Sequence, residues 1–259
     1  MTTAYASHPL AAGSPPVWAS AWDQDAYGPW CSFRLREVTQ RLRWIPPGRF
    51  LMGSPSRERG RETAEGPQHA VRFTQGFWLF DTPCTQALWQ AVMGMNPSHF
   101  QGEQHPVEQV SWEECQHFLA AFTQLLPELR LVLPTEAQWE YACRTGTQTP
   151  RYEAELDAIA WYAGNSHDTT QAVAQKRPNA WGLYDMLGNV WEWCHDGRRI
   201  YTRDGVVDPV GPTAVGTDQA LRGGGWDLPA QYVRTANHLR FFPRGRHAAL
   251  GFRAASAGM

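Results

Sequence analysis

No long helical pattern follows Gly146, and the rest of the chain is interrupted repeatedly by Gly, Pro, Asn and Asp. Such residues end helices and strands, so this half is expected to consist of loops and short strands. Loops need packing to hold them, and Trp side chains supply large buried surfaces whose N–H groups can satisfy loop carbonyls. The chain contains 13 Trp, 23 Gly and 19 Pro, which indicates a loop-rich fold with aromatic packing and excludes a helical bundle.

Helices are predicted in the first half, where helix start signals precede apolar stripes. Ser111 and Glu114 form a capping box before one such stripe, which predicts a helix. Thr135 and Gln138 repeat the arrangement before a second helix. A shorter helix is expected over residues 85–94.

Strands and domain limits complete the prediction. Residues 43–54 are expected to form strand, turn and strand, and residues 69–80 a pair of strands. Residues 1–29 are rich in Ala, Ser and Pro and are expected to form a weakly ordered N-terminal arm. Residues 30–259 are expected to form a single domain. A few early helices followed by short strands and loops define an α+β fold class with little regular secondary structure.

Bulk properties exclude several kinds of partner. The formal net charge of -2 gives no strong attraction to nucleic acid or to a membrane surface. Mean hydropathy is -0.48, no apolar run approaches a membrane span, and the N-terminus does not resemble a signal peptide. A cytoplasmic protein is therefore expected. The five Cys residues are widely spaced without a C-x-x-C pair, which disfavours a zinc site or a disulfide framework.

Six short motifs occur in a fixed order between Arg43 and Arg253. They are GRFLMGS, PVEQVSWEECQHF, LPTEAQWEYACRTGT, NAWGLYDMLGNVWEWCHD, RGGGW and GFR. In this order they resemble the signature of the formylglycine-generating-enzyme (sulfatase-modifying factor) family. The resemblance implies an elaborated C-type-lectin fold. It agrees with a loop-rich chain in which buried tryptophans are structural, and the candidates are Trp139, Trp181, Trp191, Trp193 and Trp226.

The DMLGNVWE segment is similar to a structural calcium site of the family. Asp185 and Glu192 supply carboxylates, and Gly188 and Val190 supply carbonyls, so one all-oxygen Ca²⁺ site is expected. The alternative is a loop in which both carboxylates are solvated. A second calcium site of the family would begin at Asn165 and Ser166. Its later ligands fall near Ala174 and Lys176, where an acidic residue is missing and a cation is present, so no metal is expected there.

Copper chemistry is not expected. The oxidases of the family bind copper through two cysteines after the RGG stretch, and Leu228 and Val233 occupy those positions. Soft Cu(I) requires thiolates, which neither side chain supplies. The ergothioneine-synthesis branch of the family needs an added helical domain with three histidines, whereas residues 1–29 contain only His8.

A third branch of the family, the variable proteins of diversity-generating retroelements, is non-catalytic and resembles the C-terminal segment best. The match lies in RGGGW, then VRTAN for the branch's R-S-A-N element, then Pro243 and GFR. The resemblance implies that a set of surface positions varies. These positions are Asp227, Leu228, Pro229, Tyr232, His238, Leu239, Arg240, Phe241, Phe242, Gly245, His247, Ala248 and Ala249.

The residue types at these positions agree with adenine-directed mutagenesis of AAC codons. An AAC codon mutated at its adenines stays N-N-C and cannot encode Lys, Gln, Glu, Met or Trp. None of the thirteen positions carries one of these residues. Gln231 does, and it is expected to be a fixed residue between variable ones.

The expected function is therefore ligand binding, with no catalysis, by the variable positions together with Trp226. The ligand is expected to be a protein. Arg222, Arg234, Asn237 and Arg253 are expected to hold the backbone. Two alternatives remain open: Phe241 and Phe242 could pack in the core, and the chain could be a non-copper enzyme or maturation factor, like the pyoverdine-maturation proteins of the family.

Overall fold

Three small sheets and three α-helices form the regular part of the described chain, which covers residues 8–10, 13–197, 199–213 and 217–257 in a computed structural model. The first sheet has the order β1-β2-β3-β6-β12, and all its neighbouring strands run antiparallel. Its members are β1 (Ala21–Asp25), β2 (Gly28–Leu35), β3 (Val38–Ile45), β6 (Phe77–Phe80) and β12 (Ala255–Ala257). Because β12 pairs with β6, segments from both ends of the domain meet in one sheet.

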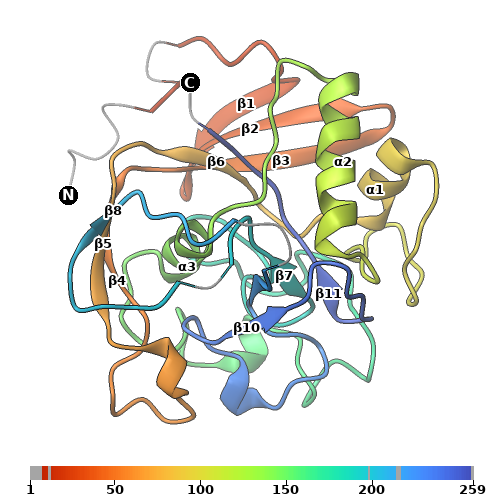
Figure 1. Cartoon of the computed structure of the whole chain (residues 1–259). Helices are drawn as coiled ribbons and strands as arrows, with labels where there is room; N and C mark the ends of the chain where they lie inside the picture. Colours follow the sequence, from red (N-terminus) through yellow and green to blue (C-terminus); the bar gives the residue numbers. More distant parts are fainter. Residues whose placement is uncertain (1–7, 11–12, 198, 214–216, 258–259) are drawn as a thin grey trace.

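The second sheet has the order β10-β9-β7-β11 and is built from the second half of the chain. Its strands are β7 (Trp191–Trp193), β9 (Gln219–Arg222), β10 (His238–Phe241) and β11 (Leu250–Gly251). β10 pairs with β9 alone and therefore forms an edge of this sheet. In Figure 1 the labelled strands β7, β10 and β11 of this sheet lie below the first sheet.

The third sheet joins two strands from the first third of the chain to a strand from a much later loop. β4 (Gly48–Met52) runs antiparallel to β5 (His69–Phe73), and β5 runs parallel to β8 (Val206–Val207). The described loops also contain three short 3-10 turns, η1 (Thr63–Glu65), η2 (Leu156–Ala158) and η3 (Ala230–Tyr232).

The predicted helices are confirmed together with their start signals. They are α1 (Gln86–Met93), α2 (Trp112–Leu125) and α3 (Glu136–Arg144). The Ser111 hydroxyl accepts a hydrogen bond from the Glu114 N–H, and Thr135 does the same for Gln138. Both capping boxes are complete.

Two apolar clusters form the core. The apolar side of α2, including Phe118 and Phe122, packs with Phe33 of β2 and Phe80 of β6. The second cluster joins α3 to the sheet of β4 and β5, where Tyr141 contacts the rings of Phe50 and Phe73. In the described residues, no helix is long and apolar enough to cross a membrane.

Two predictions about strands were wrong. Residues 69–80 contain two strands, but β5 and β6 belong to different sheets and do not pair with each other. The expected arm of residues 1–29 contains β1 and the start of β2, which pair from Ala21↔Ser32 to Asp25↔Gly28. All five residues of β1 are exposed. A strand without a buried side does not need alternating apolar residues, so the sequence pattern did not predict it.

Candidate binding face

The segment from Trp226 to Ala249 runs from the end of β9 through η3 and β10 to the start of β11. Eleven of the fourteen predicted ligand-binding residues reach solvent, and we call these eleven the C-terminal face. The exposed members are Asp227, Pro229, Leu239, Arg240, Phe242 and His247. The half-buried members are Trp226, Leu228, Tyr232, Phe241 and Ala248.

Three of the predicted positions are buried, and the prediction was wrong to place them at the surface. His238, at 5% exposure, turns inward from β10 and lies opposite Arg222 of β9. Ala249 is fully buried, and its carbonyl accepts a hydrogen bond from the Trp191 N–H. Gly245 is covered by the rings of Phe241 and Phe242, which leave no room for a side chain at this position.

The phenylalanine pair divides between core and surface. The rings of Phe241 and Phe242 stack with centroids 4.4 Å apart. Phe241 is half-buried and also contacts the Trp193 ring, whereas Phe242 is 55% exposed. The alternative of core packing therefore applies in part to Phe241 and not to Phe242.

The residues expected to hold the backbone are buried and hydrogen-bonded, as predicted. Arg234 binds the carboxylates of Glu58 at 2.6 Å and Glu65 at 2.5 Å, and it also donates to the Gly60 carbonyl. The Asn237 amide donates to the Tyr232 carbonyl at 2.6 Å. Arg234 thereby fixes η3 against a loop more than a hundred residues earlier in the sequence.

A buried ionic network lies beneath β10. The Arg222 guanidinium lies 2.9 Å from carboxylate oxygens of both Glu136 and Glu140. His238 Nδ1 lies 3.0 Å from Glu136 Oε1, and the Tyr201 hydroxyl lies 3.3 Å from the same oxygen. Burial by itself raises the pKa of Glu136, but the Arg222 charge and the hydrogen bond with His238 bring it down to about 2. The network therefore holds a buried carboxylate in its charged form.

Several residues that the sequence did not single out also support the C-terminal face. Arg151 donates to the carbonyls of Val233 at 3.0 Å and Ala230 at 2.5 Å. Phe100 packs edge-on against the Trp226 ring, with centroids 5.3 Å apart. Arg151 and Phe100 lie in loops without a recognisable motif, so only their three-dimensional contacts reveal this role.

The positions that correspond to the copper-binding cysteines come together around Gly224. A Cβ atom built on Gly224 lies 3.3 Å from Leu228 and 3.7 Å from Val233. Both side chains are aliphatic, so this place offers no thiolate. The five cysteines are buried elsewhere, and burial raises the pKa of each thiol, as for Cys31, whose pKa rises to about 12.

The four predicted calcium ligands lie in and just before β7. Glu192 makes a two-point ion pair with Arg253, with both N–O distances 2.7 Å, and it accepts a third hydrogen bond from the Trp139 indole. The Arg253 guanidinium also donates to the Asp185 carbonyl at 3.3 Å. The residues therefore fit calcium only if Glu192 exchanges Arg253 for the metal. In the described chain, no group of three or more His, Cys, Asp or Glu side chains is placed to hold a metal. Calcium binding stays a prediction.

The second calcium position of the family is occupied by protein contacts. Asn165 accepts from the Tyr162 N–H and donates to the Ala160 carbonyl. The Ser166 hydroxyl donates to the Trp226 carbonyl. Lys176 places its ammonium 3.8 Å from the centre of the Trp161 ring. These contacts tie the loop to the C-terminal face.

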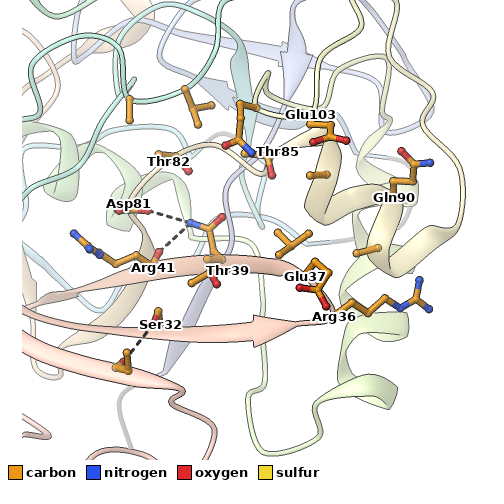
Figure 2. Close-up of a pocket in the computed structure, with 18 of the residues that line it drawn as sticks. Ser32, Arg36, Glu37, Thr39, Arg41, Asp81, Thr82, Thr85, Gln90 and Glu103 are labelled. Atoms are coloured by element: carbon orange, nitrogen blue, oxygen red, sulfur yellow. Dashed lines mark hydrogen bonds between the residues drawn. The ribbon is translucent and has the colours of Figure 1, made fainter.

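A polar groove of about 860 Å³ lies between β2, β3 and α1. The Gln40 amide, one of the groups that line it, donates to the Arg41 carbonyl at 3.0 Å and to the Asp81 carboxylate at 3.1 Å. Figure 2 draws these two hydrogen bonds as dashed lines that end at Arg41 and Asp81. Burial raises the pKa of the Asp81 carboxyl to about 6. None of the predicted ligand-binding residues lines this groove, so it is separate from the C-terminal face.

Comparison with known families decides the identity of the domain. The family model described as "Sulfatase-modifying factor enzyme 1-like domain" matches residues 14–257. The chain belongs to this family. The formylglycine-generating enzyme of Streptomyces coelicolor is 33% identical over 192 residues, which cover 66% of this chain and 58% of that enzyme. The chain thus spans little more than half the length of this relative.

Two solved structures are similar to nearly the whole domain. Treponema denticola variable protein 1 has a TM-score of 0.78 and 30% identity, and the match covers 88% of this chain and 99% of that one. PvdO from Pseudomonas aeruginosa has a TM-score of 0.77 and 26% identity, with 87% and 97% covered. The expected α+β fold of the formylglycine-generating-enzyme type, and the similarity to variable proteins, are confirmed.

Proposed function

We propose that this protein binds a protein ligand through the C-terminal face, that the codons of this face are diversified, and that it catalyses no reaction. The observation that carries the proposal is the contrast within one segment. The eleven side chains of the C-terminal face reach solvent, while Arg234 and Asn237 between them are buried and hold the backbone. A fixed backbone under changeable side chains is the arrangement of a paratope, because preorganisation lowers the entropy cost of binding.

The chemistry of the C-terminal face supports protein recognition. Trp, Tyr and Arg are the residue types that dominate binding energy at interfaces, and this face presents Trp226, Tyr232 and Arg240. Leu239 of β10 is 43% exposed, and Phe242, directly after the strand, is 55% exposed. Exposed apolar groups gathered in one place favour a partner that covers them.

The similarity to Treponema denticola variable protein 1 also supports this proposal, since it extends over almost the entire domain. The test is to sequence many copies of the gene from one source population. We expect substitutions at the codons of the C-terminal face, an unchanged Arg234 codon, and a nearby template copy beside a reverse-transcriptase gene. Identical codons at all these positions, without a template copy, would reject diversification.

A non-copper enzyme or maturation factor is the second candidate. The buried pairing of His238 with Glu136 favours it, because a histidine close to a carboxylate is a common acid–base arrangement. The similarity to PvdO agrees with either role. Copper oxidation of a peptide cysteine is not expected, since Leu228 and Val233 cannot bind copper. A Cys-Thr-Pro-Ser-Arg peptide incubated with the protein and copper should give no formylglycine by mass spectrometry, and turnover would overturn this part of the proposal.

A further inference from the structure

A pocket of about 700 Å³ lies where the loop after β4 meets the loop before β8. Two arginines, three hydroxyl side chains and one amide contribute its polar groups, and no carboxylate lines it. The lining residues are Ser54, Pro55, Ser56, Arg61, Thr63, Gly66, Pro67, Gln68 and Arg203. We propose that this pocket binds a tetrahedral oxyanion group, phosphate or sulfate, carried by a ligand.

The charge of this pocket is a consequence of how the loop folds. The sequence SRERGRETAEG contains three arginines and three glutamates and is neutral as a string. In the structure, Glu58 and Glu65 turn inward and both bind Arg234. Because Arg234 comes from the C-terminal segment, it removes two carboxylates that could otherwise pair with the arginines of the loop. The loop therefore presents an excess of positive charge to solvent.

Arg61 and Arg203 are left without a carboxylate partner in the part of the chain that the structure describes. Arg61 is held in place, because its Nε lies 3.4 Å from the Ser54 carbonyl and its guanidinium lies against Gly66. Because Gly66 has no side chain, the Arg61 guanidinium can occupy the space beside it. A Cβ atom at residue 66 would collide with this guanidinium. A positioned guanidinium with free donors suits the oxygens of a phosphate or sulfate group.

The neighbouring polar groups complete a donor-rich site. Ser54 is buried, whereas Ser56 and Thr63 are exposed on either side of Arg61 along the loop. The two exposed hydroxyls, Ser56 and Thr63, can each donate one hydrogen bond to an oxyanion. Arg203 is exposed and contributes a second guanidinium from a distant part of the sequence. This site shares no lining residue with the C-terminal face, so the inference stands apart from the proposed function.

Isothermal titration of the full chain with sodium phosphate, and separately with sodium sulfate, tests the proposal. Sodium chloride at equal ionic strength serves as the reference, since simple screening affects all salts alike. We expect one saturable site for phosphate, sulfate or both. In R61Q/R203Q the affinity should fall by about tenfold or more, because charge-assisted hydrogen bonds are lost. The stronger of the two anions identifies the group that the natural ligand carries.

The double variant R57Q/R59Q is the matched control. It removes the same charge from the same region, but Arg57 and Arg59 do not line the pocket. Its affinity should stay within about twofold of the original, since only long-range attraction changes. Absence of saturable binding, or equal losses in both double variants, would overturn the proposal. If R61Q destabilises the loop, the single variant R203Q replaces the double variant, because it alters only an exposed side chain of the pocket. Its anion affinity should also fall.

Discussion

His238 Nδ1 lies 3.0 Å from Glu136 Oε1, although the next two residues of β10, Leu239 and Arg240, face solvent. His238 therefore supports the scaffold. We expect H238A to lower the free energy of unfolding by about 2–4 kcal/mol, because it leaves a cavity and removes a partner of a buried carboxylate. Urea unfolding measures this, with L239A as the control, since the adjacent side chain is exposed. Equal, small losses in both variants would show that His238 does not belong to the buried network.

The exposed part of the C-terminal face should tolerate combined substitution. We expect L239A/R240A/F242A to change the free energy of unfolding by no more than about 1.5 kcal/mol, since each exposed replacement usually stays within about 0.5 kcal/mol. F241A is the contrast, because Phe241 also packs on Trp193. Thermal melts of both variants measure the difference. A large loss in the triple variant would mean that these side chains support the core, and the binding proposal would then fail.

The buried ion pairs of Arg234 with Glu58 and Glu65, which we call the Arg234 clamp, should be essential for stability. Removing one partner of a buried ion pair leaves uncompensated charge, which costs about 3–5 kcal/mol, so R234M should unfold at much lower denaturant concentration. R244M is the matched control, because Arg244 pairs with Glu113 at the surface and exposed pairs contribute at most about 1 kcal/mol. Similar midpoints for the two variants would contradict the role given to Arg234.

Glu108 should make stability depend on pH. Burial raises the pKa of its carboxyl from an ordinary value of 4.5 to about 7, although the Phe100 N–H donates to it. Between these values the folded chain holds the proton more tightly than the unfolded chain, so stability falls as pH rises from 4.5 to 7.

The loss is at most about 3.5 kcal/mol, since each pKa unit between 4.5 and 7 corresponds to about 1.4 kcal/mol. E108Q keeps an oxygen for the Phe100 N–H and cannot ionise, so its stability should fall less over this range. Urea titrations at pH 5 and pH 8 compare the two proteins. Parallel losses in both would exclude Glu108 as the cause.

Calcium should raise the melting temperature if it binds at Asp185, Gly188, Val190 and Glu192, because a ligand that binds only the folded state stabilises it. Melting with calcium and with a chelator measures the effect. D185N should abolish the difference, since it removes a carboxylate ligand. A melting temperature unaffected by calcium would reject the calcium site. Glu192 would then be neutralised by its ion pair with Arg253.

Capping residues close to each helix start predicted the helices, whereas the sequence did not predict which strands pair with each other. The capping boxes at Ser111 and Thr135 specify helix starts through contacts within four residues, so the sequence reveals them directly. The separation of β5 and β6 into two sheets depends on partners that lie far away in the chain. A strand pattern shows that a strand exists and does not identify its neighbour.

The candidate site was predictable to a similar degree. Family resemblance located the segment, and the exposure of Leu239, Arg240 and Phe242 agrees with it. Burial of His238 was missed, because an imidazole suits both a surface and an ionic core. The partners of Arg234 were also missed. Glu58 and Glu65 lie in a highly charged loop, and such a loop is expected to expose its charged side chains to solvent.

The Arg234 clamp has a consequence for protein engineering. The side chains that fix the backbone of this segment are encoded outside the eleven codons of the C-terminal face, and their partners Glu58 and Glu65 are encoded in another part of the gene. A synthetic library randomised at those eleven codons would therefore give every member the same loop geometry. Selection from such a library would sample side-chain chemistry on one constant frame, as in an antibody-display repertoire.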